Sequence, residues 1–257
     1  MSLDPDQDGK PHPEKITFVS QGISLPALLF ARDRSVARPG VVVLPGRVGA
    51  IEDLAWLCQP LAEAGFVTLA IQYRPIQTQY YFTDVEDVLS ALEFLRALNF
   101  VAPFQLGVVG HSRGGIAALN AARKADSVKA IVALSPVTDH LHLVKGLREF
   151  APSRYELMVA ARGGTPEEIP DYYLKISPRY HADQIRIPVL LIHGTSDLIT
   201  PHEHSVWMLE ALKKAGNERT SLELIQGAGH FFEQTYHGYA FEKVAGLAVT
   251  WMQEHLK

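Results

Sequence analysis

The sequence lacks several features that mark special classes of protein. Cys58 is its only cysteine, which excludes an intramolecular disulfide. With 24 Lys and Arg against 28 Asp and Glu, its formal net charge of −4 gives no basic surface of the kind that binds nucleic acid. No apolar run approaches the roughly 18 residues of a membrane span, and the N-terminus lacks the charged-then-apolar order of a secretory signal. We therefore expect a cytoplasmic protein whose partners include neither nucleic acid nor a membrane.

What is present is the pattern of a domain built from alternating strands and helices. Hydrophobic residues make up 47% of the 257 residues and charged residues 20%, which is ordinary for a globular protein. Short apolar runs that alternate with amphipathic segments predict a mainly parallel sheet with helices on both faces, an α/β fold in one domain over residues 1–257. Residues 1–15 are polar, and we expect a flexible lead-in there. Residues 137–187 interrupt the alternation and are expected to form a small helical cap inserted over the sheet.

The expected elements follow from these patterns in chain order. Two N-terminal strands joined at Gln21-Gly22 would extend one edge of the sheet as antiparallel pairs. The expected strands are 16–20, 25–32, 41–44, 66–71, 106–109, 128–134, 189–192 and 221–225. The expected helices are 54–64, 84–98, 115–124, 203–215 and 238–255.

The stretch Gly110-His111-Ser112-Arg113-Gly114 joins an apolar strand to an alanine-rich helix. In that context G-x-S-x-G predicts a nucleophile elbow, a sharp turn that projects the serine hydroxyl above the sheet. The two glycines let strand and helix approach closely, and the free N–H groups of the helix point to where an oxyanion would form. A nucleotide-binding loop is excluded, because neither the P-loop spacing nor G-x-G-x-x-G is present. The pattern therefore predicts Ser112 as a nucleophile.

A serine nucleophile needs a general base and an orienting acid, which in this architecture follow the serine in the order acid, then histidine. Two aspartates fit the acid by position: Asp197, in a loop after a late strand, and Asp139, after the strand before it. The best candidate base is His230, because it follows the last predicted strand in a glycine-rich loop. His237, at the start of the last helix, is its nearest competitor.

We expect neither a metal nor a cofactor. Asp139, His140 and His142 lie close together in the sequence, but the segment contains no other ligand pattern. His202 and His204 likewise lack a third partner at a spacing that a metal could use.

Two backbone N–H groups are expected to form the oxyanion hole. One belongs to Arg113, the residue after the nucleophile, and the other to Arg47, in the loop after the third predicted strand. Tyr73 and Arg74 follow the next strand on the same side of the sheet and, with Tyr81, are candidate substrate contacts. A packing role for each of these three is equally open. Apolar walls with few charges would favour small or aromatic acyl groups.

Several stretches in a fixed order resemble a known family. They are GHSRGG at 110–115, Ile176-Ser177-Pro178, IPVLLIHGTSDLITP at 187–201 and GAGHFF at 227–232. The chain resembles the α/β-hydrolase superfamily, and it is similar to the catalytic domain of the prolyl oligopeptidase family and to dienelactone-hydrolase-like small esterases. The resemblance implies Ser112 as nucleophile, Asp197 as acid and His230 as base, and it favours Asp197 over Asp139.

The sequence departs from these relatives in ways that bear on activity. Many members of the wider superfamily carry His-Gly in the oxyanion loop, whereas this chain has Pro45-Gly46, so hydrogen bonds from that histidine are lost. Oligopeptidases of the family carry a large N-terminal β-propeller that gates access, and we expect no such structure from these 257 residues. Dienelactone hydrolases use a cysteine nucleophile where this chain has Ser112.

Residues and resemblance together predict a serine hydrolase that cleaves carboxylic esters through an acyl-enzyme. The first alternative is an aminopeptidase or acylpeptide hydrolase of the prolyl oligopeptidase type; an aminopeptidase would need carboxylates, such as Glu167 or Glu168, to hold a free amine. The second alternative is a non-catalytic binding protein that keeps the fold. The expected partner is a small-molecule ester or a short peptide, and assembly into a homo-oligomer is left open.

Overall fold

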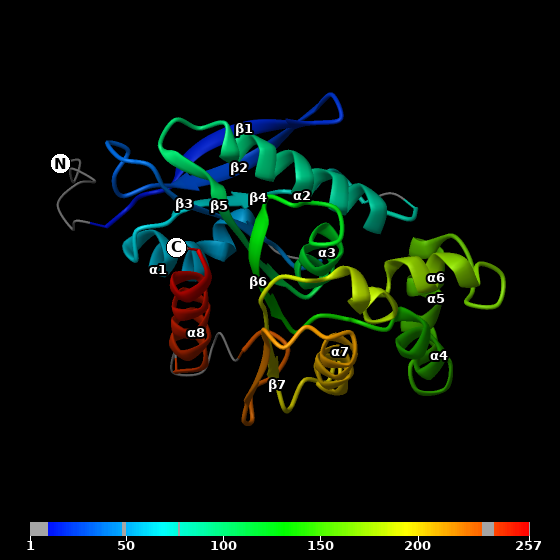
Figure 1. Cartoon of the computed structure of the whole chain (residues 1–257). Coiled ribbons are helices and arrows are strands. Elements are labelled where there is room, and N and C mark those ends of the chain that lie inside the picture. Colours follow the sequence, from blue (N-terminus) through cyan, green and yellow to red (C-terminus); the bar gives the residue numbers. More distant parts are fainter. Residues whose placement is uncertain (1–9, 48–49, 77, 233–238, 257) are drawn as a thin grey trace, which may run out of the picture.

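The computed structural model describes residues 10–47, 50–76, 78–232 and 239–256 (Figure 1). In this part of the chain eight strands form one sheet, in the order β1-β2-β4-β3-β5-β6-β7-β8. The mainly parallel α/β fold predicted from the sequence is thereby confirmed. The strands are β1 (Glu14–Ser20), β2 (Ile23–Phe30), β3 (Arg38–Leu44), β4 (Val67–Ile71), β5 (Val101–His111), β6 (Val128–Leu134), β7 (Val189–Gly194) and β8 (Thr220–Ile225).

The first two strands extend one edge of the sheet, as predicted. β1 pairs antiparallel with β2, and β2 pairs antiparallel with β4, whereas the other pairings are parallel. Gln21 and Gly22 join the two strands with φ of 48° and 79°, the left-handed conformations that a tight hairpin turn uses. The lead-in expected to reach residue 15 ends earlier, because Glu14 and Lys15 already pair within β1.

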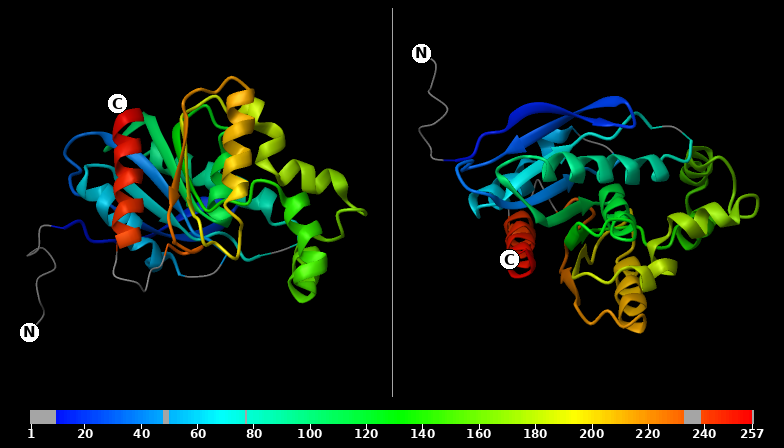
Figure 2. Two further views of the ribbon diagram at one scale, coloured as in Figure 1. Left: turned by 90° about the horizontal axis from the view of Figure 1, so that it is seen from below. Right: turned by 45° about the horizontal axis from the view of Figure 1, so that its top comes forward.

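Helices cover both faces of the sheet (Figure 2). One apolar cluster packs α2, α3 and α7 on one face, and a second packs α1 and α8 on the other. Val42 and Leu44 of β3 belong to the first cluster and Val41 and Val43 to the second, which is why that strand is apolar throughout. The helices are η2 (Ile51–Leu54), α1 (Ala55–Glu63), α2 (Tyr81–Arg96), α3 (Arg113–Ala121), α7 (Glu203–Lys214) and α8 (Tyr239–His255).

The segment expected to form a cap contains short helices that lie to one side of the sheet (Figure 1). They are α4 (His140–Phe150), α5 (Pro152–Arg162) and α6 (Pro170–Ile176), and the segment also contains η3 (Pro178–Gln184). Side chains of α4 and α6, together with Tyr80 and Tyr81 at the start of α2, form a third apolar cluster. We propose that α4, α5 and α6 are the cap inferred from the sequence, whereas η3 packs against α7 of the main layer.

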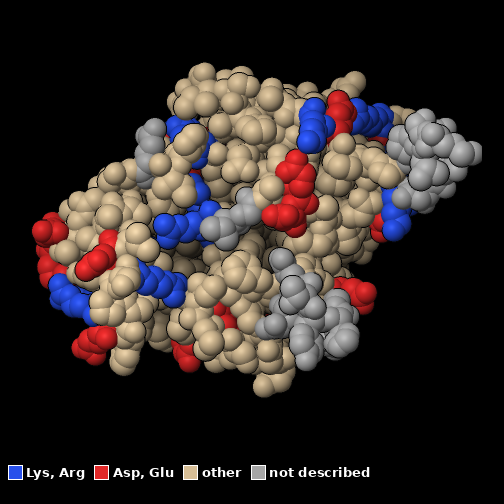
Figure 3. Space-filling view, turned by 180° about the vertical axis from the view of Figure 1, so that it is seen from behind, with Lys and Arg blue, Asp and Glu red and all other residues tan. Residues whose placement is uncertain are grey.

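The molecular surface carries mixed charges. On the face shown in Figure 3, lysines and arginines lie in small groups near aspartates and glutamates, with broad uncharged areas between them. Within the described ranges, no helix combines the length and apolar character that crossing a membrane requires.

Candidate active site

The carboxyl ends of β5, β7 and β8 meet at one edge of the sheet, because these strands are parallel. Ser112 follows β5 directly, Asp197 lies in the loop after β7, and His230 lies in the loop after β8. The structure therefore brings together the three side chains predicted as nucleophile, acid and base.

Ser112 occupies a strained turn between β5 and α3. Its backbone has φ 53° and ψ −110°, a conformation that residues with a side chain rarely adopt. A Cβ added at Gly110 would clash with the backbone of Gly114, and one added at Gly114 would lie 2.6 Å from the carbonyl oxygen of Leu44. Glycine is therefore required at both positions for the helix to leave the strand so sharply, which is the geometry of the elbow predicted from the sequence.

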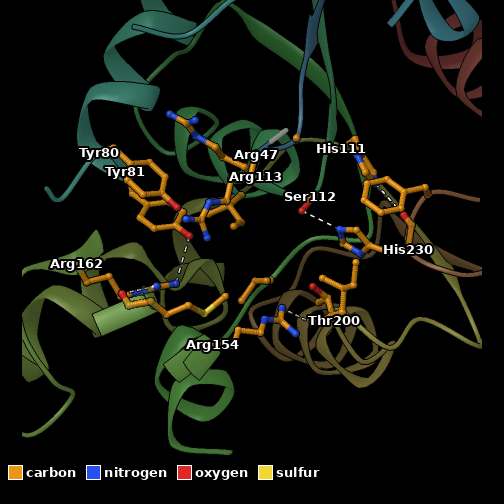
Figure 4. Close-up of a pocket in the computed structure, with 16 residues that line it drawn as sticks. Arg47, Tyr80, Tyr81, His111, Ser112, Arg113, Arg154, Arg162, Thr200 and His230 are labelled. Atoms are coloured by element: carbon orange, nitrogen blue, oxygen red, sulfur yellow. Dashed lines mark hydrogen bonds between the residues drawn. The ribbon is translucent and has the colours of Figure 1, made fainter. Parts of the chain in front are cut away.

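A chain of hydrogen bonds links the three side chains, and Figure 4 shows the part of it between Ser112 and His230. His230 Nε2 lies 3.0 Å from Ser112 Oγ, and His230 Nδ1 lies 2.7 Å from Asp197 Oδ2. A carboxylate only accepts, so Nδ1 carries the proton and Nε2 is free to accept the serine proton. The other carboxylate oxygen, Oδ1, accepts from the backbone N–H groups of Ile199 and Thr200 at 2.8 and 2.7 Å, which fixes the orientation of the carboxylate.

His193 is a second histidine on the same carboxylate, and only its spacing of four residues from Asp197 could have indicated this contact. Its Nε2 lies 3.1 Å from Asp197 Oδ2 and 2.9 Å from the carbonyl oxygen of Thr200. Both are acceptors, so Nε2 donates, and Nδ1 accepts from the hydroxyl of Ser205 at 2.7 Å. Burial by itself would raise the pKa of Asp197, but hydrogen bonds from His193 and His230 outweigh it and hold the pKa well below its ordinary value. Asp197 is therefore ionised throughout the neutral pH range.

His111, the residue before the nucleophile, ties the elbow to the loop of the candidate base. Its Nε2–H donates to the backbone carbonyl of His230 at 2.8 Å. Burial, together with the nearby His230, lowers the pKa of His111 to about 4, so the ring is neutral at physiological pH. A Cβ on Gly46 would lie 3.2 Å from Nδ1 of His111, so the predicted oxyanion loop packs against the same ring.

The two residues predicted to supply oxyanion donors, Arg47 and Arg113, both line the pocket in front of Ser112. The next two residues of the oxyanion loop, Val48 and Gly49, lie outside the described residues. The guanidinium of Arg113 is engaged elsewhere: it binds the buried carboxylate of Asp84 with two nitrogens, the Nε–Oδ2 distance being 2.7 Å.

Of the three candidate substrate contacts, only Tyr81 lines the described part of the pocket. The placement of Tyr73 and Arg74 at the site was wrong. Both side chains lie beside α2, where they contact its acidic residues or a partner of those residues. The ring of Tyr73 packs 4.5 Å from the guanidinium of Arg113, which Asp84 binds. Arg74 Nε donates to Asp87 at 2.9 Å, so its charge is already paired.

The rival acid, Asp139, has other partners in the described chain. Asp139 accepts from Arg179 and Tyr180 at 3.0 and 2.8 Å, and it caps α4 by accepting from the N–H of His142. It therefore has partners other than the candidate base. His237 lies outside the described residues. Over the described ranges, no group of three or more His, Cys, Asp or Glu side chains is placed to hold a metal ion.

The pocket in front of Ser112 has a volume of about 360 Å³ and is bounded by the elbow, the oxyanion loop and α5 of the cap. Its described lining contains four arginines and no aspartate or glutamate, which differs from the expectation of walls with few charges. Apolar and aromatic side chains fill the spaces between the arginines. The lining residues are Gly46, Arg47, Tyr80, Tyr81, His111, Ser112, Arg113, Ile116, Val137, Arg154, Met158, Arg162, Ile199, Thr200, His230 and Phe231.

Comparison with known proteins places the chain in a family. The prolyl oligopeptidase family matches residues 53–257, which is most of the chain. An uncharacterized peptidase of Bacillus subtilis, YtmA, is 27% identical over 210 residues, covering 77% of this chain and 79% of that protein. The esterase LipC of Mycobacterium tuberculosis is 26% identical over 217 residues, covering 76% of this chain and 53% of the esterase.

A solved structure shares the fold over nearly the whole chain. It is a puromycin-hydrolyzing peptidase of Mycobacterium tuberculosis, with a TM-score of 0.83 and 21% identity. The match covers 98% of this chain and 40% of that peptidase, so the chain spans less than half of its length. Family match, fold and the similarity to both peptidases and esterases agree on one conclusion: this chain belongs to the prolyl oligopeptidase family and is a serine hydrolase with the α/β-hydrolase fold.

Proposed function

We propose that this serine hydrolase cleaves carboxylic esters through an acyl-enzyme formed on Ser112. The observation that carries the proposal is the unbroken hydrogen-bond chain from Ser112 through His230 to Asp197. A serine hydroxyl is a weak nucleophile at its ordinary pKa, and a hydrogen-bonded histidine held by a carboxylate is the arrangement that activates it.

In the proposed reaction, His230 Nε2 takes the proton of Ser112 as Oγ attacks the ester carbonyl. Asp197 holds the ring in the required tautomer and stabilises the imidazolium that forms. The N–H groups of Arg47 and Arg113 stabilise the oxyanion, a contribution of about 10²–10³ in rate for one such donor. His230 then protonates the departing alcohol, and a water molecule attacks the acyl-enzyme with His230 again as base.

The charges around the pocket support esters over substrates with a free amine. An aminopeptidase needs a carboxylate near its nucleophile to bind the substrate ammonium group, and the described pocket lining offers only arginines as charged side chains. Of the two cap carboxylates considered from the sequence, Glu167 pairs with Arg148 at 3.6 Å, and Glu168 accepts from the backbone N–H of Thr165 at 2.8 Å. Neither carboxylate belongs to the described lining.

A substrate panel tests this proposal. Wild-type protein is assayed on 4-nitrophenyl esters, on aminoacyl 4-nitroanilides and on N-acyl-aminoacyl 4-nitroanilides, beside Ser112→Ala and the control Ser90→Ala on α2. We expect the highest kcat/KM on esters, its loss in Ser112→Ala and its retention in Ser90→Ala. Faster cleavage of the anilides would favour a peptidase activity, which the names of several relatives carry. Full ester activity in Ser112→Ala would refute the assignment of Ser112 as the nucleophile.

A further inference from the structure

A buried arginine in the active-site pocket has no acidic partner. Arg162, at the end of α5, is only 1% exposed and is one of the largest fully buried side chains in the described structure. It lines the pocket that contains Ser112. Burying a charge is costly unless an opposite charge compensates for it, so an arginine in this position calls for an explanation.

The partners of Arg162 in the described chain are all neutral. Nη1 donates to the carbonyl oxygen of Met158 at 2.9 Å, and Nη2 donates to His140 Nδ1 at 2.8 Å and to the hydroxyl of Tyr81 at 3.3 Å. Burial lowers the pKa of His140 well below its ordinary value, and Arg162 lowers it further, so that ring is uncharged. The Nε atom of Arg162 is buried without a hydrogen-bond partner. The guanidinium therefore keeps both an uncompensated charge and a free donor.

Two further arginines line the same pocket. They are Arg154, about two turns before Arg162 on α5, and Arg47 of the oxyanion loop. Arg154 donates to the carbonyl oxygen of Ile199 at 2.8 Å, another neutral partner. Burial lowers the pKa of Arg154, and the positive charges of Arg47 and Arg162 add to this effect, although Asp197 opposes it. An anion in the pocket would relieve this repulsion.

The position of Arg162 identifies the part of the substrate that it would contact. His230 must protonate the leaving alcohol, so the alcohol lies on the side of His230 and the acyl group extends away from it. Arg162 and Tyr81 lie at the opposite end of the pocket from His230, with Arg154 between them and the base (Figure 4). The guanidinium therefore faces the distal end of a bound acyl group.

We propose that the pocket selects esters whose acyl group ends in a carboxylate, that is, monoesters of dicarboxylic acids. The inference rests on the proposed ester hydrolase function and names its substrate class. Arg162 binds the distal carboxylate through charge-assisted hydrogen bonds, and Arg154 adds a second positive charge. Ile116, Val137 and Met158 supply apolar wall for the intervening carbon chain. In the reaction the bond between carbonyl carbon and alcohol oxygen breaks, water supplies the new hydroxyl, and the products are the alcohol, the dicarboxylate and one proton.

The first test uses wild-type protein alone. It compares kcat/KM for 4-nitrophenyl monoesters of adipic and suberic acid with that for the corresponding methyl 4-nitrophenyl diesters, which match in length but lack the charge. A hydrogen bond to a charged group contributes about 1.5–3 kcal/mol, so we expect the charged substrates to be favoured by about 10- to 160-fold. Equal or better turnover of the neutral diesters would overturn the inference and leave the ester hydrolase function standing.

The second test asks whether the preference depends on the arginines. Arg162→Gln and Arg154→Gln should lower kcat/KM far more for the monoester than for the diester, and Arg162→Lys should retain part of the preference. Arg148→Gln is the matched control, because Arg148 is an exposed cap arginine paired with Glu167. An Arg162→Gln variant that loses both substrates equally would show a purely structural arginine and contradict the inference.

If Arg162→Gln does not fold, a third test on wild-type protein distinguishes the two outcomes. Inhibition of neutral-ester hydrolysis by monomethyl adipate, a carboxylate, is then compared with inhibition by uncharged dimethyl adipate on wild-type protein. Stronger inhibition by the carboxylate supports the inference, and equal inhibition refutes it. If wild-type protein turns over no ester at all and its serine does not react with a fluorophosphonate, the proposed function itself fails and the inference falls with it.

Discussion

The ion pair between Asp84 and Arg113 should respond very differently to the loss of each partner. Asp84 is fully buried and Arg113 is 6% exposed, with its guanidinium between the rings of Tyr73 and Tyr80 at 4.5 and 4.4 Å. Replacing Asp84 by Asn keeps the shape but leaves a guanidinium that cannot lose its proton. Removing one partner of a buried pair typically costs about 3–5 kcal/mol, and we expect that loss for Asp84→Asn.

Replacing Arg113 instead leaves the carboxyl group of Asp84, which can bind a proton and become neutral. Burial already raises the pKa of Asp84 to about 6, although Arg113 opposes this shift. In Arg113→Met the opposing charge is gone, so the folded-state pKa rises further above the unfolded value. Near pH 6 the carboxyl is then protonated, and the variant should lose only about 1–3 kcal/mol, the penalty of an imperfectly bonded polar group.

The sign of the pH dependence follows from this pKa. A folded-state pKa raised above the unfolded value gives stability at low pH that is lost as pH rises, by about 1.4 kcal/mol per pH unit until the folded pKa is reached. In wild-type protein the folded-state pKa of Asp84 is about 6, so above pH 6 its stability no longer changes through this group. In Arg113→Met the folded-state pKa is higher, so the variant continues to lose stability above pH 6. The loss of unfolding free energy in Arg113→Met, relative to wild type, should therefore grow between pH 6 and 8. The loss in Asp84→Asn should stay constant over the same range.

Urea unfolding of both variants and wild type, at pH 6 and pH 8, measures these free energies. A double variant, Asp84→Leu with Arg113→Met, tests the pair as a unit and should recover much of the loss, since buried pairs are often replaceable by apolar residues. An Arg113→Met deficit that equals or exceeds that of Asp84→Asn at pH 6, or that does not change with pH, would refute the reasoning.

Three further predictions concern the site and its support. Asp197→Asn should lower kcat by about 10⁴ in a steady-state ester assay, because the amide favours the wrong tautomer of the base; unchanged KM would separate this effect from weaker substrate binding. Gly110→Ala should leave little folded protein by circular dichroism, since its Cβ would clash with the Gly114 backbone; a normally folded variant would contradict the tight elbow. Acid should destabilise the fold, because burial lowers the pKa of His204 to about 3 and that of His140 well below its ordinary value. Unfolded histidines bind protons near pH 6.5, so stability is complete above that pH and should fall below it by up to about 1.4 kcal/mol per pH unit for each histidine; urea unfolding that is flat from pH 8 to 5 would contradict this.

The parts of the fold that local patterns encode could be predicted from the sequence. Fully apolar runs such as 41–44 and 189–192 must be buried on both faces, and the structure has them as central parallel strands. The elbow was recognisable because steric crowding requires glycine at 110 and 114 around one serine. The proximity of Ser112, Asp197 and His230 then follows from the shared edge of a parallel sheet.

Long-range partner choice is what the sequence could not reveal. Arg74 follows a strand at the correct edge, but its charge is taken by Asp87, thirteen residues later on α2. The arginines of the pocket were missed for a related reason. Arg154 and Arg162 belong to a short cap helix, and no local pattern indicates that this helix turns them toward Ser112. β5 is also longer than its apolar run, because Val101 already pairs with Arg38 of β3.

Fluorophosphonate labelling tests the central claim most directly, because these reagents phosphonylate an activated serine whatever the natural substrate. Folded wild-type protein and the Ser90→Ala control should be labelled, peptide mapping should place the adduct on Ser112, and Ser112→Ala should remain unlabelled. Folded wild-type protein that stays unlabelled, or an adduct on another residue, would contradict the assignment of Ser112 as the nucleophile of this hydrolase.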